Sequence, residues 1–357
     1  MRLTEVAFDD LPGWRQSDMA PALAAFVRSC SIIAAKPAAT PMGGKGYGGM
    51  AADWLSACGA AKGAPRDFFE ENFVPYRVSA GGAAQGLFTG YYEPLIAGSR
   101  TRQGAYQTPV YGLPPDLVRV DLSLFSQRFQ GEHISGRLDG RRLVPYATRA
   151  DIDAHGLENT RILFWTDDPV ALFFLQIQGS GRVRFDDGPS ERIAFAGENG
   201  RPYTAIGRVL IGTGELTREQ VSLVSIRKWL GDHPSRAQAV MEADASFVFF
   251  EEKPLGDAGL GSPGTEGAAL TPRASLAVDP RQHVLGAPFY VDAMPVRGLL
   301  IGQDTGGAIT GPVRGDVFFG FGEKAEKDAG SMKADGRMYV LLPKRVAEKM
   351  GKRKDFP

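Results

Sequence analysis

Short apolar runs divided by glycine- and proline-rich turns fill most of this chain, and they restrict its possible folds more than any other feature. The 357 residues include 45 glycines and 24 prolines, residue types that end helices and build turns. We therefore expect a mainly β protein built around a barrel, rather than a parallel α/β sheet or a helical bundle. The expected strands lie at 87–93, 162–165, 174–178, 182–185, 274–278, 289–291, 298–301, 317–319 and 337–342.

Helical patterns are concentrated before residue 75 and return in three later places. Apolar residues at helical spacing predict helices over 19–35, 50–60, 65–73, 169–173, 217–229 and 234–243. Thr217 and Gln220 form a capping-box pattern at the start of the fifth of these. Glycine-rich stretches at 43–49 and 256–267 are expected to be a flexible linker and a mobile loop.

The charge balance argues against a nucleic-acid partner. Lysine and arginine together number 41, as do aspartate and glutamate, so the formal net charge is zero. Proteins that bind nucleic acid usually carry a basic excess, because neutralising phosphates supplies most of their affinity. With two cysteines outside any metal-ligand spacing and four histidines, we expect no metal and no cofactor.

The sequence leaves the cellular compartment open. Cys30 and Cys58 would pair in an oxidising compartment, but their spacing alone does not decide this. No run approaches the roughly 18 apolar residues of a transmembrane helix. The first 25 residues lack the apolar core of a secretory signal, and Cys30 lacks the small apolar stretch that precedes a lipidated cysteine.

Three aspartates in the last third of the chain are the candidate chemical groups. Asp279, Asp304 and Asp316 each lie at the edge of an expected strand among small or apolar residues. Apolar surroundings disfavour the charged form of a carboxyl and raise its pKa from about 3.9, as a general acid for glycosidic bond cleavage requires. Considered singly, such aspartates more often cap turns or accept backbone hydrogen bonds.

The pattern around these aspartates is more specific than their composition. The segments Ala277–Pro280, Gln303–Gly311 and Gly315–Gly320 resemble the three-aspartate (3D) domain of lytic transglycosylases. With the upstream segments, the chain resembles the membrane-bound lytic murein transglycosylase A family from about Phe68 to Leu342. The further segments that carry this resemblance are 90–94, 107–111, 174–181, 196–203, 206–211, 246–250, 322–330 and 336–340.

The resemblance implies a fold of two domains. The first is a double-psi β-barrel built from residues 1–103, which include the N-terminal helices, and residues 215–357, which include the 3D region at 271–343. The second is a smaller β-barrel inserted over residues 104–214.

The resemblance also implies a reaction and its site. Asp316 corresponds to the single catalytic carboxyl, an acid and then a base in exolytic, non-hydrolytic cleavage of peptidoglycan, with Asp304 beside it tuning its pKa or orientation. The resemblance does not decide whether Asp279 supports the catalytic site or has a purely structural role. The loop between Asp304 and Asp316 is one residue longer than the family pattern. The implied glycan contacts are Tyr91, Tyr92, Gln178, Gly179, Ser180, Gly306 and Gly307, and strand alternation leaves one of the two tyrosines for the core.

Two other functions remain open from the sequence. Glu93 or Asp304 could activate water as a second carboxylate, which would make the protein a hydrolase. A non-catalytic glycan-binding module on the same barrel is the other alternative. In each case we expect the partner to be peptidoglycan glycan strands and the protein to be a monomer. We expect it in the periplasm or at the outer membrane, with a peripheral or lipid-anchored association.

Overall fold

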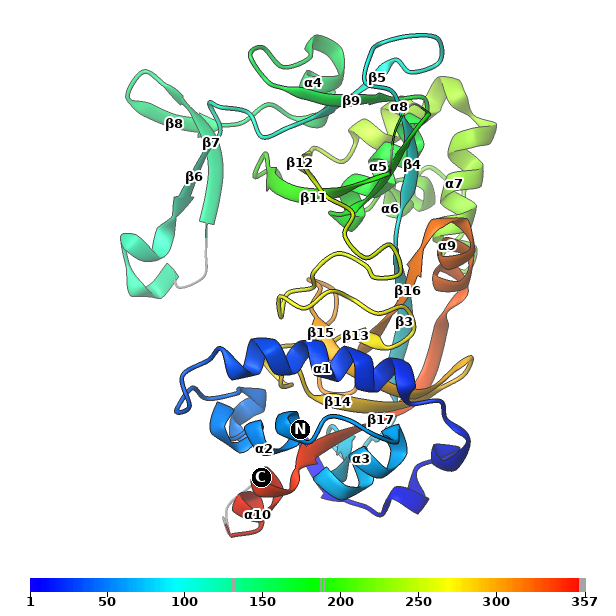
Figure 1. Cartoon of the computed structure of the whole chain (residues 1–357). Helices are drawn as coiled ribbons and strands as arrows, with labels where there is room; N and C mark the ends of the chain where they lie inside the picture. Colours follow the sequence, from blue (N-terminus) through cyan, green and yellow to red (C-terminus); the bar gives the residue numbers. More distant parts are fainter. Residues whose placement is uncertain (130–132, 187, 189, 353–357) are drawn as a thin grey trace. The chain divides into compact units, whose positions relative to one another are not determined.

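The chain forms two compact units in the computed structural model, which describes residues 1–129, 133–186, 188 and 190–352. One unit comprises Met1–Tyr92 and Asp257–Pro357, and the other comprises Glu93–Gly256 (Figure 1). The expected domain boundaries were 103 and 214. The contacts instead divide the chain after Tyr92 and Gly256, because the helices that follow residue 214 pack into a core of the second unit.

The first unit is built on a closed ring of six strands. Its strand order is β17–β14–β15–β13–β16–β3, and a pairing between β3 and β17 closes the ring. Two further strands, β1 and β2, continue the sheet from β17. The bounds are β1 Arg2–Glu5, β2 Phe73–Ser79, β3 Gly86–Glu93, β13 Ser275–Ala277, β14 Pro288–Ala293, β15 Val296–Asp304, β16 Gly315–Phe321 and β17 Lys333–Pro343. The expected barrel is therefore confirmed, and the double-psi crossing stays a prediction.

The central barrel strands are buried on both faces. All six residues of β14 are buried, and so are the last six residues of β17. One face fills the barrel interior. Helix α1 (Ala20–Ala34) packs against β15 from outside, and Figure 1 shows it lying across the barrel. Burial on both faces explains why the sequences of these strands are continuous apolar runs, without alternating polar residues.

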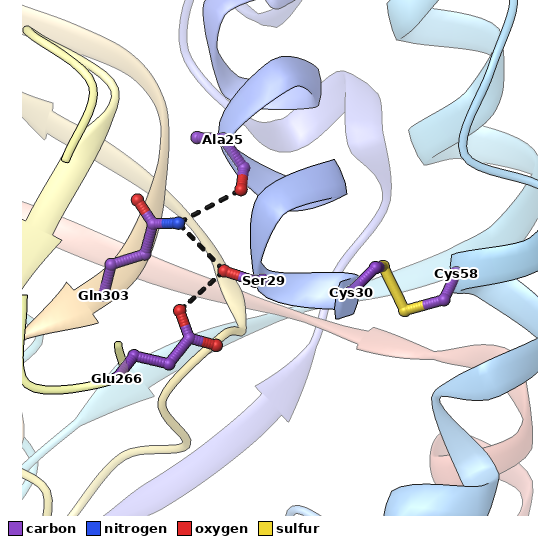
Figure 2. The surroundings of a disulfide bond; sticks show 6 residues. All are labelled: Ala25, Ser29, Cys30, Cys58, Glu266 and Gln303. Atoms are coloured by element: carbon purple, nitrogen blue, oxygen red, sulfur yellow. Dashed lines mark hydrogen bonds between the residues drawn. A yellow bond between two sulfur atoms is a disulfide. The ribbon is translucent and has the colours of Figure 1, made fainter. Parts of the chain in front are cut away.

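A disulfide joins two of the N-terminal helices. Cys30 of α1 is bonded to Cys58 of α2 (Leu55–Gly59), which settles the pairing that the sequence left open. Figure 2 shows the neighbouring Ser29 pointing away from Cys30, toward Gln303 of β15 and Glu266. The Gln303 side chain also donates to the Ala25 carbonyl, 3.0 Å away. Helix α1 is thus fixed to α2 on one side and to the barrel on the other.

The remaining helices of the first unit are short. The expected helix over 50–60 is divided into a 3₁₀ turn, Ala51–Asp53, and α2. Helix α3 (Pro65–Asn72) begins at its proline as predicted and packs Phe68 and Phe69 against Phe26 and Phe73. Helices α9 (Gly322–Ser331) and α10 (Lys344–Lys352) follow β16 and β17.

The strands of the second unit also form a ring. A four-stranded sheet has the order β12–β11–β10–β4, and β5 pairs with β9. Single bridges from Ser99 to Trp165 and from Gly112 to Phe250 connect these two sheets at both ends. A separate meander comprises β6, β7 and β8. The bounds are β4 Leu95–Gly98, β5 Thr108–Tyr111, β6 Val118–Asp121, β7 His133–Asp139, β8 Arg142–Pro145, β9 Ile162–Thr166, β10 Gly181–Phe185, β11 Glu191–Glu198 and β12 Val248–Lys253.

One predicted element of the second unit was wrong, and another begins later than predicted. Residues 174–178, expected to be a strand, are the second half of α5, which begins at Pro169 after the Asp168 cap and ends at Gln178. Its residues 172–176 are all buried, and periodicity cannot separate a fully buried helix from a buried strand. The helix expected from residue 217 begins at Leu223, because Ser222 supplies the N-cap. The other helices are α4 Arg149–His155, α6 Ile206–Gly212, α7 Leu223–Asp232 and α8 Pro234–Glu242.

Among the residues that the structure describes, no helix combines the length and apolar character that crossing a membrane requires.

Candidate active site

Strand β13 brings two of the three aspartates together. Its last residue, Ala277, pairs with Asp304 of β15 on one side and with Asp316 of β16 on the other. Side chains directly opposite each other on neighbouring strands lie on the same face of a sheet. The register of β15 shifts by one residue between Leu276 and Ala277. This irregularity places Asp304 rather than Gln303 on the face of Asp316 and leaves the Gln303 side chain for helix α1.

The Asp316 carboxyl is half-buried and has the character of an acid. Its Oδ1 accepts a hydrogen bond of 2.6 Å from the Thr89 hydroxyl of β3. Burial raises the pKa of Asp316, and the negative charge of Asp304 raises it further. The Thr89 hydrogen bond and the charge of Arg314 act in the opposite direction, but the net pKa lies above the usual value. The carboxyl is therefore biased toward its protonated form.

Asp304 is held as a hydrogen-bond acceptor. Its Oδ2 accepts from the Tyr91 hydroxyl at 2.9 Å. Its Oδ1 accepts from the Thr265 amide and hydroxyl, both at 3.0 Å, and from the Thr305 amide at 2.9 Å. Burial and the charge of Asp304 hold the pKa of Tyr91 well above its usual value, so the phenol keeps its proton and serves as the donor.

Asp279 lies two residues beyond β13 and anchors the chain that leads to Asp316. It is 1% exposed, accepts from the Gly311 amide at 2.8 Å, and forms an ion pair of 3.0 Å with Arg281. Burial acts to raise the pKa of Asp279, but the hydrogen bonds from Arg281 and Gly311 outweigh it and lower the pKa to about 2. Of the two roles left open by the sequence, these contacts favour the structural one.

We predict that Asp279→Asn weakens the protein most above pH 5. The folded pKa of about 2 lies below the unfolded value of about 3.9. The stabilisation is therefore present above the unfolded pKa and is lost as the pH falls toward 2. Chemical denaturation at several pH values should give a difference between wild type and variant that shrinks on acidification. Asp9→Asn, in an exposed pair with Arg15, is the control. A difference that does not depend on pH would contradict this account.

The tyrosines of β3 divide between surface and core. Tyr91 is half-buried, with its ring 5.3 Å from that of Phe318 and its hydroxyl on Asp304. Tyr92 is 4% exposed, as strand alternation predicts for one of the pair. The prediction of Tyr92 as a glycan contact is corrected, because its ring is enclosed by the protein.

The glycines after Asp304 lie in an exposed loop. Gly306 and Gly307 are both exposed, and the Gly306 carbonyl accepts from the Ile309 amide at 2.8 Å, which closes a turn. A Cβ on Gly306 would lie 2.9 Å from the Ile309 side chain. A side chain at this position would therefore force that turn to shift.

Sequence reasoning missed Thr89 and Thr265, which donate to Asp316 and Asp304, and Arg314, which donates to Thr89. Thr89 lies two positions before Tyr91 on β3, so alternation puts both side chains on one face and could have identified it. Thr265 was assigned to a mobile loop, and Arg314 to the loop between Asp304 and Asp316. Thr265 and Arg314 carry no signal of their own, because their contacts come from segments distant in the sequence.

The remaining predicted site residues belong to the second unit. Gln178 is the last residue of α5, Gly179 follows it in the left-handed conformation with φ of 77°, and Ser180 precedes β10. All three are half-buried. Glu93 is 2% exposed and pairs with Arg182 at 2.8 Å and Arg192 at 3.5 Å. Burial and these two ion pairs favour a structural role for Glu93 over the alternative of a second catalytic carboxylate.

Two family models match the chain. Residues 87–251 match the model described as MltA specific insert domain, and residues 274–342 match the 3D domain. Together they cover most of β3, the inserted segment and the strands that carry the aspartates.

Curated relatives and solved structures agree with these matches. Membrane-bound lytic murein transglycosylase A of Escherichia coli is 34% identical over 268 residues, which cover 71% of this chain. The chain spans 65% of the length of that relative. The Vibrio cholerae protein of the same name is 33% identical, with 73% of this chain and 67% of the relative covered.

Among solved structures, a membrane-bound lytic murein transglycosylase from Agrobacterium tumefaciens superposes with a TM-score of 0.82 at 32% identity, covering 98% of this chain and 99% of its own. MltA from Neisseria gonorrhoeae gives 0.80 at 30%, with coverages of 96% and 91%. E. coli MltA with bound chitohexaose gives 0.68 at 26%, with 90% of each chain covered. On these matches, the chain belongs to the membrane-bound lytic murein transglycosylase A family.

Proposed function

We propose that the protein cleaves the glycan strands of peptidoglycan without consuming water, with Asp316 as the only acid and base. The observation that carries this proposal is the half-buried Asp316 carboxyl, whose pKa is raised by burial and by the adjacent Asp304 charge. The names of the relatives and the glycan bound to one neighbour support the choice of substrate.

The proposed reaction uses one proton twice. Protonated Asp316 gives its proton to the oxygen between N-acetylmuramic acid and N-acetylglucosamine, and the bond from this oxygen to the muramoyl C1 breaks. The positive centre left at C1 is oxocarbenium-like or is held by the neighbouring N-acetyl group. The Asp316 carboxylate then takes the proton of the muramoyl C6 hydroxyl while O6 bonds to C1. A 1,6-anhydro ring forms, and Asp316 is protonated again.

The neighbours of Asp316 take supporting roles in this proposal. Asp304, fixed by hydrogen bonds to both of its oxygens, keeps a negative charge near Asp316 that favours the protonated acid. The half-buried ring of Tyr91 offers a flat apolar face of the kind that sugars stack on. Gly306 and Gly307 leave room at the exposed loop for close approach of a ligand. Gln178, Gly179 and Ser180 stay proposed glycan contacts in the second unit.

The products distinguish this reaction from hydrolysis. We expect mass spectrometry of digested sacculi to give muropeptides that end in anhydromuramic acid, each lighter by one water than its hydrolytic counterpart and inert to borohydride. A muramidase acting on the same sacculi is the control and should give reducible ends. The proposed exolytic mode predicts short products from the first minutes. Reducible muramic ends from this protein would reject the lytic reaction in favour of the hydrolase.

We further propose a location in the periplasm or at the outer membrane. The Cys30–Cys58 disulfide suits an oxidising compartment, and the curated relatives are named membrane-bound. Fractionation of the host cells tests this assignment. The monomeric state stays a prediction.

A further inference from the structure

Arg314 connects the part of β3 that precedes Tyr91 to β16, the strand that carries Asp316. Its Nη2 donates to the Thr89 hydroxyl oxygen at 2.8 Å, and its Nη1 donates to the Leu87 carbonyl at 3.3 Å and to the Gly315 carbonyl. The guanidinium therefore bridges β3 and the first residue of β16. The side chain is half-buried, and burial lowers the pKa of Arg314 while the charge of Asp316 raises it. A guanidinium remains charged in proteins at any working pH.

Two successive hydrogen bonds connect Arg314 through Thr89 to Asp316, and in each the donor lies on the Arg314 side. A guanidinium can donate but cannot accept, so the bond between Arg314 and Thr89 fixes the Thr89 oxygen as its acceptor. The single hydroxyl proton of Thr89 is then free to point to Asp316 Oδ1, 2.6 Å away. A hydroxyl that accepts from a cation is polarised and becomes a stronger donor. Asp316 Oδ1 is accordingly an acceptor, whether the carboxyl is protonated or not.

We propose that Arg314 is a positioning residue that, through Thr89, reserves Oδ1 as an acceptor and leaves Oδ2 of Asp316 as the oxygen that delivers and retakes the proton. This inference rests on the proposed function, and it names which oxygen reacts and which residue selects it. Within the described part of the chain, Oδ2 has no hydrogen-bond donor, whereas Oδ1 has Thr89. The Asp316 proton therefore lies on Oδ2, the oxygen that does not accept from Thr89.

Arg314 also balances the two states of Asp316. Burial and the Asp304 charge favour the protonated acid, whereas the Thr89 hydrogen bond and the Arg314 charge favour the carboxylate. The other titratable group on this face, Tyr91, remains a neutral phenol bonded to Asp304. Without Arg314, the carboxylate that exists between the two proton transfers would lose both a nearby positive charge and the fixed direction of the Thr89 proton. Arg314 would therefore act on turnover more than on binding.

The test combines kinetics with a titration that needs no substrate. Arg314→Met keeps the aliphatic stem and removes the charge and the donors. We expect kcat to fall about 10- to 100-fold with KM nearly unchanged, the range expected for one charge-assisted hydrogen bond.

The pKa of Asp316, followed by ¹³C NMR of labelled aspartate and assigned with Asp316→Asn, should rise. The high-pH limb of the kcat/KM profile should move in the same direction, since the acid then keeps its proton to higher pH. Arg314→Lys should recover part of the rate through its charge.

A double-mutant cycle separates positioning from simple support of the fold. Thr89→Ser keeps the hydroxyl and should therefore retain much more activity than Thr89→Val, which lacks it. In a Thr89→Val background, Arg314→Met should lower kcat much less than it does alone. The relay, by which we mean the two hydrogen bonds from Arg314 through Thr89 to Asp316, is already broken there. Equal losses in both backgrounds, or an unchanged Asp316 titration in Arg314→Met, would overturn the proposal. Reducible muramic ends from the wild type would instead reject the proposed function, and the NMR titration would still report on the relay.

Discussion

Asp316→Asn is expected to lower the rate of muropeptide release from sacculi by at least about 10³-fold, because general acid and general base catalysis each contribute about 10²–10⁴-fold and one carboxyl supplies both. Asparagine has nearly the same shape and can still accept from the Thr89 hydroxyl, but it has no proton to give to the glycosidic oxygen. Glycan binding, followed by co-sedimentation with sacculi, should stay within about threefold of wild type, since the lost interaction belongs to the transition state.

The same substitution should leave the fold intact or strengthen it. The pKa of Asp316 is raised in the folded protein by burial and by Asp304, so at neutral pH its ionised form is disfavoured there relative to the unfolded chain. Asparagine removes that cost, and the thermal midpoint should be equal to or above that of wild type. Asp328→Asn, on the exposed face of α9 and paired with Arg273 and Lys324, is the matched control for loss of a carboxylate. Release of muropeptides by Asp316→Asn at the wild-type rate would reject Asp316 as the acid.

The barrel strands were predictable because their composition leaves little choice. Segments 289–291, 298–301 and 337–342 are apolar and bounded by turn residues, and they form β14, β15 and β17. Their pairing was not predictable from composition. The ladder that places Asp304 and Asp316 on either side of Ala277 depends on a one-residue irregularity in β15. No local preference encodes that shift, which turns the Gln303 side chain toward α1, where it donates to the Ala25 carbonyl.

The contacts of the acid were hidden for a related reason. Thr89 and Asp316 are 227 positions apart in the sequence, and neither a threonine in a strand nor an arginine in a turn carries chemical information by itself. The family resemblance could indicate Asp316, since it rests on ordered motifs. Which side chains orient that carboxyl is a property of the closed ring, in which β3 lies beside β16.

The misassigned segment 174–178 has a different physical cause. Leu175 is fully buried and Gln176 is 5% exposed, so apolar residues surround this helix and its pattern has no polar face. Gln176 is nevertheless a polar residue in the core, where it accepts from the buried Arg149 guanidinium and donates to the Val248 carbonyl at 3.3 Å. Helical geometry is fixed here by the Asp168 cap and by Gly179 at the C-terminus, local signals that outweigh the β propensity of the aromatic residues.

Glu93→Ala is expected to destabilise the second unit by about 3–5 kcal/mol, because it would leave the buried Arg182 guanidinium without its carboxylate. Glu93 and Arg182 have side chains 2% and 6% exposed, and Arg192 approaches the same carboxylate at 3.5 Å. The unfolding midpoint should fall by roughly 10 °C. Glu251→Ala is the matched control, since its pair with Lys253 on the nearby β12 is half-exposed and should change stability by less than about 1 kcal/mol.

The kinetics of the same variant decide whether Glu93 is a structural ion-pair partner or a general base. If Glu93 is the structural ion pair, kcat measured well below the midpoint and corrected for the folded fraction should stay within about threefold of wild type, because no step of the reaction uses this carboxylate. A general base that activates water would give the opposite result, in which turnover falls by about 10²-fold or more while stability is retained. A large loss of turnover at full stability would therefore reject the ion-pair account.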